Sequence, residues 1–554
     1  MTLLAELLSN QYVFFAGVSK EWRKAWGGIP KLTRAITADT SLSQLQWSFD
    51  CGLRKDSVIC KHIAQLCGFE ILRCAYSNGC PFSRDTLIAA AAKGKLEMIQ
   101  WVLGKEWYWR RDVCSAAAAG GSLPILIWAR SENCPWNSTV CSSAAGSGHL
   151  DILQWARSEN CPWDASTCIC AARGGHLGIL QWARANDCPW NSNVCWVAAE
   201  SGNLGILQWA RLEGCRWDSY TCFKASAKGH LGTLQWARMN GCPWSSLTSA
   251  AAARSGRLDI LQWSRSEMCP WDASTCTGAA ASGHLGILQW ARANSCPWTS
   301  ETCSAAARSG NLDILQWARS EGCPWDALTC SMAASGGHLG VLQWARANGC
   351  DWNSRTILLA VEKGNLAIAQ WARAQGCPWS SGACKAAAKH GRLDILEWLM
   401  AHGCPWSPFT SGAAAMNGHV HILEWIRTRG YPSRSNSICR MAAVAGHLGV
   451  LQWARSNGYD WEVGTCSVAA RMGRFEVLKW ARANGCPWDE STCTAAAGAG
   501  HMNILQWARS QGCPWDSRTY KRSKSCPDEQ MEEWVRLNGC PQEAEAGGYG
   551  VHVV

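Results

Sequence analysis

One short tract, Leu-Gln-Trp-Ala-Arg, returns along the chain at a fixed interval. Its Trp follows a register of 27 residues: Trp155, Trp182, Trp209, Trp236, Trp290, Trp317 and Trp344. Variants of the tract extend this register from Trp47 to Trp534, with one step of 28 residues between Trp425 and Trp453. A strict period of this length is typical of a stacked solenoid, here of about nineteen copies. Each copy in such a stack contacts only its neighbours, and the copies together form one extended surface.

The composition supports a folded chain. Hydrophobic residues make up 47% of its 554 residues, and the net charge of +10 permits an acidic partner without requiring one. The first residues contain no basic region, and the apolar stretch 12–18 is too short for a signal core or a membrane span. We therefore expect a cytoplasmic or nuclear protein that has no membrane partner and whose 33 Cys stay reduced.

The sequence of each copy predicts two short helices joined by tight turns. In the copy from Asp326 to Trp352, Asp326 is a favoured N-cap for a first helix that ends near Gly336. The apolar residues of 339–347 form one stripe at helical spacing, and Gly349 fits a left-handed C-terminal cap. A short helical pair cannot bury its own stripe, so we predict an all-α, superhelical solenoid of stacked helical hairpins.

The sequence TCSMAASGGHLGVL of residues 329–342 resembles ankyrin repeats. In that family an Ala-Ala pair on the first helix is followed by Gly-His-Leu and an aliphatic second helix that ends in Gly. The resemblance covers residues 41–540 and implies an ankyrin-like array that binds a protein along its groove. The copies depart from the family pattern because they are about six residues shorter than an ankyrin unit. The turn Cys-Pro-Trp-Asp replaces the β-hairpin of that family.

The two ends of the chain differ from the array. Residues 12–23, with the sequence YVFFAGVSKEWR, resemble the second half of an F-box, which in that family docks the adaptor subunit of a cullin ubiquitin ligase. Two interpretations of residues 1–40 stay open, a helical cap that shields the first copy and a degenerate F-box-like segment. We expect the array to occupy residues 41–540 and a disordered tail to follow over 541–554.

The repeated Cys and His columns do not predict a metal or catalytic site. One Cys precedes Pro-Trp and another lies seven residues on, a spacing that does not supply the close ligand pairs of structural zinc. Ser249 and Ile357 replace Cys in the second column, which indicates buried thiols that pack between helices. The His column, as at His338, alternates with Asn and Arg. With no phosphate loop or nucleophile motif in the sequence, we expect no enzyme, no catalytic residue, no cofactor and no metal.

An Arg column follows the Trp of the second helices by two residues, as at Arg319 and Arg346. Helices packed side by side would place these guanidiniums roughly 10 Å apart, in a line that suits phosphates. Alternatively, each Arg lies over its Trp or pairs with an acid such as Glu321. Because such acids partly cancel the charge, we expect nucleic acid to be disfavoured as a partner.

The step of 28 residues falls within residues 431–438, which lack the usual Cys-Pro-Trp. Losing that Trp removes a large apolar contact between copies. We therefore expect the weakest interface of the array there, with the first proteolytic cleavage at Arg434.

The two positions after the first-helix Cys vary freely between copies, as in Trp196-Val197, Phe223-Lys224 and Ser331-Met332. Such variation is typical of a recognition surface. It is equally typical of a solvated face whose residues can change without effect. The partner-binding residues that we predict are Trp196, Phe223, Lys224, Arg308 and Met332. The predicted function is that of a monomeric, non-enzymatic protein–protein interaction scaffold. The alternatives are a substrate adaptor of a cullin-type ubiquitin ligase and a nucleic-acid binder that uses the Arg column.

Overall fold

The computed structural model describes residues 36, 38, 40–50, 55–104, 111–432, 438–462, 464–526 and 529–542. These residues form 37 α-helices, α4 to α40, and contain no strand, in agreement with the predicted all-α solenoid. None of the described helices is both long and apolar enough to span a bilayer. The F-box-like motif and most of the predicted C-terminal tail lie outside the described residues, so both stay predictions.

The chain divides into two compact units, residues 1–275 and 276–554. The first helices of the hairpins in unit 1 are α5 (Ser57–Leu66), α7 (Arg84–Ala92), α9 (Arg111–Ala119), α11 (Ser138–Ser147), α13 (Ala165–Gly174), α15 (Asn193–Glu200), α17 (Ser219–Lys228) and α19 (Ser246–Arg254). The second helices are α4 (Leu42–Asp50), α6 (Phe69–Ser77), α8 (Leu96–Leu103), α10 (Leu123–Ser131), α12 (Leu150–Ser158), α14 (Leu177–Ala185), α16 (Leu204–Leu212), α18 (Leu231–Met239) and α20 (Leu258–Ser266). Helix α21 (Ala273–Ser282) contains the boundary between the units.

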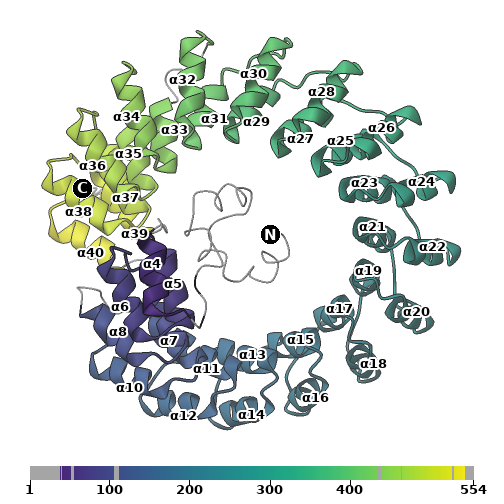
Figure 1. Cartoon of the computed structure of the whole chain (residues 1–554), viewed down its shortest axis with the longest axis horizontal. Helices are drawn as coiled ribbons and strands as arrows, with labels where there is room; N and C mark the ends of the chain where they lie inside the picture. The colour runs from purple at the N-terminus through teal and green to yellow at the C-terminus, as the bar shows by residue number, and fades with distance from the viewer. Residues whose placement is uncertain are drawn as a thin grey trace, which may run out of the picture. The chain divides into compact units, whose positions relative to one another are not determined.

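Unit 2 repeats the same alternation. Its first helices are α23 (Ser300–Ser309), α25 (Ala327–Gly336), α27 (Ser354–Lys363), α29 (Ala383–Lys389), α31 (Thr410–Met416), α33 (Ile438–Ala445), α35 (Thr465–Arg471), α37 (Glu490–Gly498) and α39 (Ser517–Lys524). Its second helices are α22 (Leu285–Ala293), α24 (Leu312–Ser320), α26 (Leu339–Ala347), α28 (Leu366–Ala374), α30 (Leu393–Ala401), α32 (Val420–Thr428), α34 (Leu448–Ser456), α36 (Phe475–Ala483), α38 (Met502–Ser510) and α40 (Glu529–Leu537). Figure 1 shows the two layers within each unit, with α11, α13 and α15 on the inner side of α12, α14 and α16.

Local sequence explains where the helices begin and end. The carboxylate of Asp326 accepts a hydrogen bond from the backbone N–H of Leu328, so it caps α25 as predicted. Gly337 ends α25 with a φ of 85°, and Gly349 follows α26 with a φ of 81°. Both lie in the left-handed region that glycine adopts without strain.

The core lies between the two layers of each unit. In one copy it consists of Ala333 and Ala334 of α25 with Val341, Leu342 and Ala345 of α26, all buried. Small Ala side chains let adjacent first helices approach, and the larger aliphatic residues of the second helices fill the space behind them. The repeated Trp of the second helices is buried at Trp425 of α32, but it is only half-buried in most other copies. Trp344, which belongs to the apolar stripe that stacking was expected to bury, is only half-buried.

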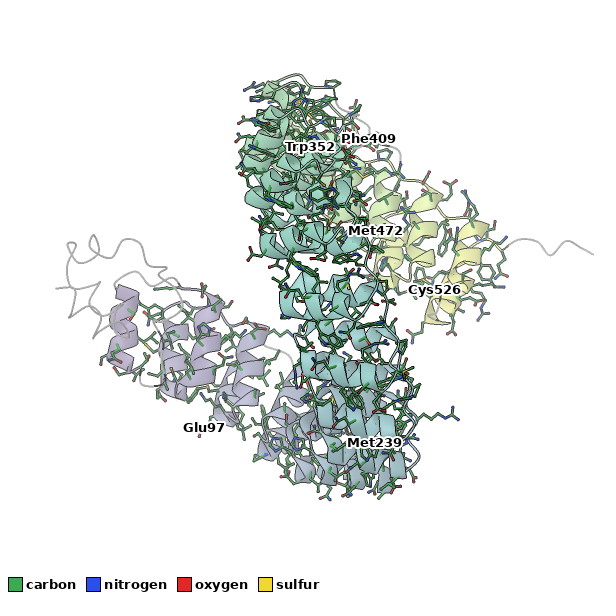
Figure 2. The ribbon with its side chains drawn as sticks, turned by 90° about the vertical axis from the view of Figure 1, so that its right-hand side faces the viewer. Glu97, Met239, Trp352, Phe409, Met472 and Cys526 are labelled. Atoms are coloured by element: carbon green, nitrogen blue, oxygen red, sulfur yellow. The ribbon has the colours of Figure 1, made fainter. Side chains whose placement is uncertain are left out.

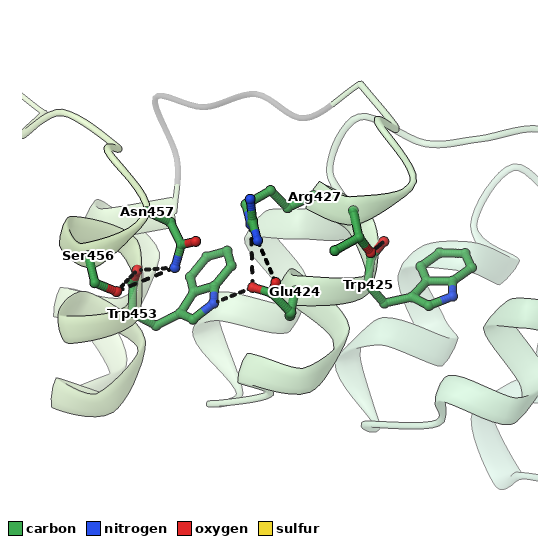
Figure 3. Close-up of polar contacts among 7 residues, drawn as sticks. Glu424, Trp425, Arg427, Trp453, Ser456 and Asn457 are labelled. Carbon is green, nitrogen blue, oxygen red and sulfur yellow. Dashed lines mark hydrogen bonds and ion pairs between the residues drawn. The ribbon is translucent and has the colours of Figure 1, made fainter.

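Polar and aromatic contacts surround the 28-residue step, and one of them, from Trp453 to Glu424, joins the copies on either side of it. Figure 3 shows Trp453 of α34, whose indole Nε1 donates to Glu424 of α32 at 2.8 Å, and Arg427, which pairs with the same carboxylate at 2.5 Å. Tyr431 stacks on the rings of Trp406 and Trp425, with centroids 4.6 and 5.2 Å away. These contacts stand in for the absent Cys-Pro-Trp turn. Arg434 lies outside the described residues, so the expected cleavage there stays a prediction.

A buried carboxyl precedes α35 and makes the stability of unit 2 depend on pH. Glu462 is 9% exposed, and burial raises the pKa of its carboxyl. A raised pKa favours the protonated form in the folded state. Unit 2 should therefore be most stable below the pKa of an unfolded Glu, and should lose stability as the pH rises through the higher pKa of the folded state.

We predict that Glu462→Gln raises the melting temperature at pH 7, because the variant no longer buries a charge. At pH 4 the carboxyl is largely protonated in the wild type as well, so the two melting temperatures should converge. Thermal melts at a series of pH values measure this difference. Glu397→Gln, which removes a charge from an exposed position of α30, is the control. A constant difference between Glu462→Gln and the wild type at every pH would contradict the prediction.

Candidate functional site

The Arg column is occupied by contacts within each copy. The Arg319 guanidinium lies 4.2 Å from the ring centroid of Trp325, and its NH1 donates to the carbonyl oxygen of Cys323. The ring of Trp325 in turn meets Trp344 edge to face, with centroids 5.9 Å apart. The predicted Arg–Trp stacking is confirmed, but the Trp belongs to the following turn and not to the helix that carries the Arg. The same contacts recur through both units, so this column fastens turns and does not present a line of available guanidiniums.

The two Cys columns are buried as predicted. Cys323 and Cys330 are fully buried, and the Cys323 thiol lies 3.6 Å from the backbone oxygen of Thr299 in the preceding turn. Burial raises the pKa of Cys377 and of Cys439 to about 11, so these thiols stay protonated at neutral pH. Among the described residues, no three His, Cys, Asp or Glu side chains gather in a way that suits a metal ion. The first column packs in the turns and the second within the first helices, as at Cys323 and Cys330.

The column of His, Asn and Arg precedes each second helix, at a position where Asn, and in part His, can cap that helix. None of His176, Asn203 or Arg257 makes a side-chain cap. Instead these side chains reach the preceding copy: Asn203 Nδ2 donates to the Ala172 oxygen at 3.1 Å, and Arg257 NH1 donates to the Gly229 oxygen at 2.5 Å. Both acceptors are carbonyl groups at the end of a first helix, which lack helical partners. The column therefore joins successive copies, and any side chain that can donate a hydrogen bond suits it.

The variable face of unit 1 contains a cluster of aromatic side chains on α15 and α17. Tyr220 lies between the other two rings, with its centroid 5.6 Å from Trp196 in an edge-to-face contact and 5.1 Å from Phe223 in a stacked one. The ammonium of Lys224 lies 5.1 Å from the Trp196 ring and 5.2 Å from the Tyr220 ring. We call Trp196, Tyr220, Phe223 and Lys224 the aromatic cluster. Three of its four members were predicted from the sequence.

An ion pair holds the polar side of the aromatic cluster. Lys224 Nζ lies 2.9 Å from a carboxylate oxygen of Glu200, and both side chains are largely buried against their neighbours. The hydrogen bond to Glu200 is the main reason that the pKa of Lys224 is raised, so the ammonium stays charged over the rings. Within the described part of unit 1, this arrangement fixes an aromatic surface with a charged edge. Tyr220 is 43% exposed and Leu247, in the matching slot of α19, is 54% exposed, so the surface continues onto the next copy.

The other two predicted residues lie in unit 2, on the adjacent helices α23 and α25. Arg308 is exposed at the end of α23, and Met332 is half-buried on α25. The variable pair is also less exposed than its variation suggests, because Val197, Ser304 and Ser331 are buried between adjacent first helices. Tyr220 and Glu200 were missed. Tyr220 occupies a third variable slot, two residues after the cap Asp218, which a column-by-column comparison of the copies would have identified.

The arrangement defines a class of protein, a helical repeat solenoid whose recurrent residues are occupied by packing and whose variable residues range from buried to exposed. No family model matches the chain, and no curated protein matches it. Solved structures with a similar arrangement of helices include the pentatricopeptide repeat protein PPR10 in complex with an 18-nt psaJ RNA element, at 11% identity and a TM-score of 0.31, covering 98% of this chain and 93% of that one. PPR10 from maize is 12% identical over 95% of this chain and 92% of that one, with a TM-score of 0.27. The human ASB11 ankyrin repeat domain is 16% identical over 28% of this chain and 84% of that one, with a TM-score of 0.25.

These structures correct one expectation. Nucleic acid was disfavoured as a partner on the sequence alone, and that expectation is wrong, because two of the solved structures with a similar helical arrangement are complexes with RNA. The alternating helices of the two units establish the helical repeat, and its ankyrin type stays a prediction.

Proposed function

We propose that the chain is a non-enzymatic scaffold that binds a protein partner on the first-helix face of unit 1. The observation that carries the proposal is the aromatic cluster on α15 and α17. Trp196 and Phe223 are half-buried and Tyr220 is 43% exposed, so each ring leaves part of its surface for a partner to cover. Aromatic side chains dominate the binding energy of many protein interfaces. The Lys224–Glu200 pair fixes the rings before binding, which reduces the entropy lost on association.

The cluster suits an apolar segment of a partner protein. Phe223, Tyr220 and Leu247 supply adjacent apolar contacts across two first helices, while Lys224 and Glu200 supply one charge of each sign at the edge. A polar rim beside an apolar centre is the usual organisation of a protein interface.

The hairpin in this proposal is a shortened ankyrin type. Its Ala-Ala pair, its Gly-His-Leu junction and its left-handed Gly after the second helix all support that assignment, as in Ala333, His338 and Gly349. The short Trp-containing turn, fastened by Arg, takes the place of the longer ankyrin β-hairpin. The binding surface is accordingly the first-helix layer and not the turns.

The test is affinity capture of the partner from the native cell extract, followed by titration of that purified partner against variants of the full chain. Trp196→Ala with Phe223→Ala should weaken binding at least tenfold, which corresponds to about 1.4 kcal/mol. The matched control is Ile169→Ala with Leu358→Ala, which truncates apolar residues in the same helical slot outside the cluster. Equal losses in the two double variants, or capture that nuclease treatment abolishes, would reject a protein partner at this site. Circular dichroism of each variant reports whether its helices stay intact.

A further inference from the structure

The first helices at the C-terminal end of unit 2 have a strong excess of positive charge. Between α29 and α39 they contain one acidic residue, Glu490. Their basic residues are Lys385, Lys389, Arg440, Arg471, Arg518, Lys521, Arg522 and Lys524. The corresponding helices α11 to α19 of unit 1 have only Arg173, Lys224, Lys228 and Arg254 as basic residues.

These side chains share one exposed face. Lys385 and Lys389 are four residues apart on α29, so they lie one above the other on the same side of the helix. Arg440, Lys521 and Arg522 occupy the slots that in unit 1 hold the aromatic cluster, and Arg471 occupies the slot of Lys389. All are exposed. We call Lys385, Lys389, Arg440, Arg471, Lys521 and Arg522 the basic surface.

Within the part of the chain that the structure describes, the basic surface is not neutralised by contacts of the kind that occupy the Arg column. Among the described residues, no Asp or Glu forms an ion pair with its six members, whereas the neighbouring Arg518 pairs with Asp516 at 2.7 Å. Adjacent first helices are in contact from α29 to α39, and packed helices lie 8–10 Å apart. The cations therefore recur along the stack on α29, α33, α35 and α39, with none on α31 or α37.

Apolar side chains lie among these cations. Phe409, immediately before α31, is 54% exposed, and Met416 and Met472 on the same layer are 41% and 40% exposed. Phe409 and Met472 are labelled in Figure 2. Proteins that bind single strands combine a basic track for the phosphates with aromatic surfaces on which unpaired bases stack. A duplex hides the faces of its bases and cannot use such contacts.

We propose that the basic surface binds single-stranded nucleic acid. The recurring cations follow the backbone, and Phe409 stacks on a base. This site is separate from the aromatic cluster and from the Arg column, so it can succeed or fail independently of the protein partner.

The experiment measures fluorescence anisotropy of a labelled oligouridine of about twenty nucleotides with the full chain, over salt from about 50 to about 200 mM. Lys521→Gln with Arg522→Gln should weaken binding roughly tenfold at low salt and reduce the slope of log affinity against log salt by about 1.4, because two phosphate contacts are lost. Phe409→Ala should weaken binding about fivefold or more without changing that slope.

The matched control is Lys228→Gln with Arg254→Gln, which removes two exposed charges from the same layer of unit 1. It should change the affinity less than twofold. Equal effects of the two double variants would overturn the proposal, since binding would then follow net charge alone. Competition by polyglutamate at least as strong as by oligouridine would assign the surface to an acidic peptide. Equal competition by duplex RNA, or no effect of Phe409→Ala, would reject single-strand recognition.

Discussion

Leu342→Ala is expected to lower the free energy of unfolding by about 3 kcal/mol. Leu342 is fully buried in α26, as are its counterparts Leu315 and Leu288 in preceding copies. The truncation removes apolar contacts and leaves a cavity that the surrounding backbone fills only in part. Because each copy contacts its neighbours and no others, this cavity lies where two interfaces meet, and collapse on either side is restricted. Urea unfolding followed by Trp fluorescence measures the change.

Two variants of the same helix serve as comparisons. Leu342→Met keeps nearly the same volume and should cost less than about 1.5 kcal/mol. Gly340→Ala is exposed, and a Cβ added there would meet no atom within 4 Å, so helix propensity should raise stability by roughly 0.5–1 kcal/mol. If Leu342→Ala cost no more than Leu342→Met, the column would not be a packed core.

Trp325→Ala is expected to cost about 2–3 kcal/mol, which is less than for a fully buried Trp because this ring is half-buried. The indole lies between the Arg319 guanidinium and the edge of Trp344. Its loss removes a cation–π contact and an aromatic pair at once, and leaves the guanidinium without a surface to pack on.

A double-mutant cycle separates these contributions. Arg319→Ala combined with Trp325→Ala should give a coupling energy of about 0.5–2 kcal/mol, since each single variant already removes their mutual contact. Trp325→Phe keeps a ring against Arg319 and should recover more than half of the loss. A coupling energy near zero would show that Arg319 fastens the turn through the Cys323 carbonyl alone.

The local parts of the fold follow from sequence because their causes are local. The cap at Asp326 and the left-handed Gly349 each depend on a few neighbouring residues, and the structure places both as predicted. The apolar stripe of 339–347 likewise determines the bounds of α26, Leu339–Ala347. A repeat strengthens such inferences, because the same capping residues and apolar spacing recur from copy to copy.

Contacts between copies were harder to predict, because they depend on how far one hairpin is displaced from the next. The sequence indicates that Arg319 has a Trp to pack on, but two Trp are near in sequence and only the path of the turn selects Trp325. Asn203 has the chemistry of a cap, yet a preceding helix end lies close enough to accept its hydrogen bond. Tyr220 joins Trp196 to Phe223 only because α17 packs beside α15 at this displacement.

The hydrogen bonds from the His, Asn and Arg column end on backbone carbonyl groups, as at Ala172 and Gly229. Every helical hairpin offers the same acceptor, whatever side chains it carries. A donor of this kind therefore fits any neighbour, and a junction between two copies survives when one is exchanged for another. Duplication or deletion of a whole copy within a unit can therefore keep these hydrogen bonds, whereas contacts between particular copies, such as Lys224 with Glu200, would change. The number of copies, and with it the length of the surface, can thus change in evolution by single recombination events. Each copy that is gained or lost carries its own variable residues.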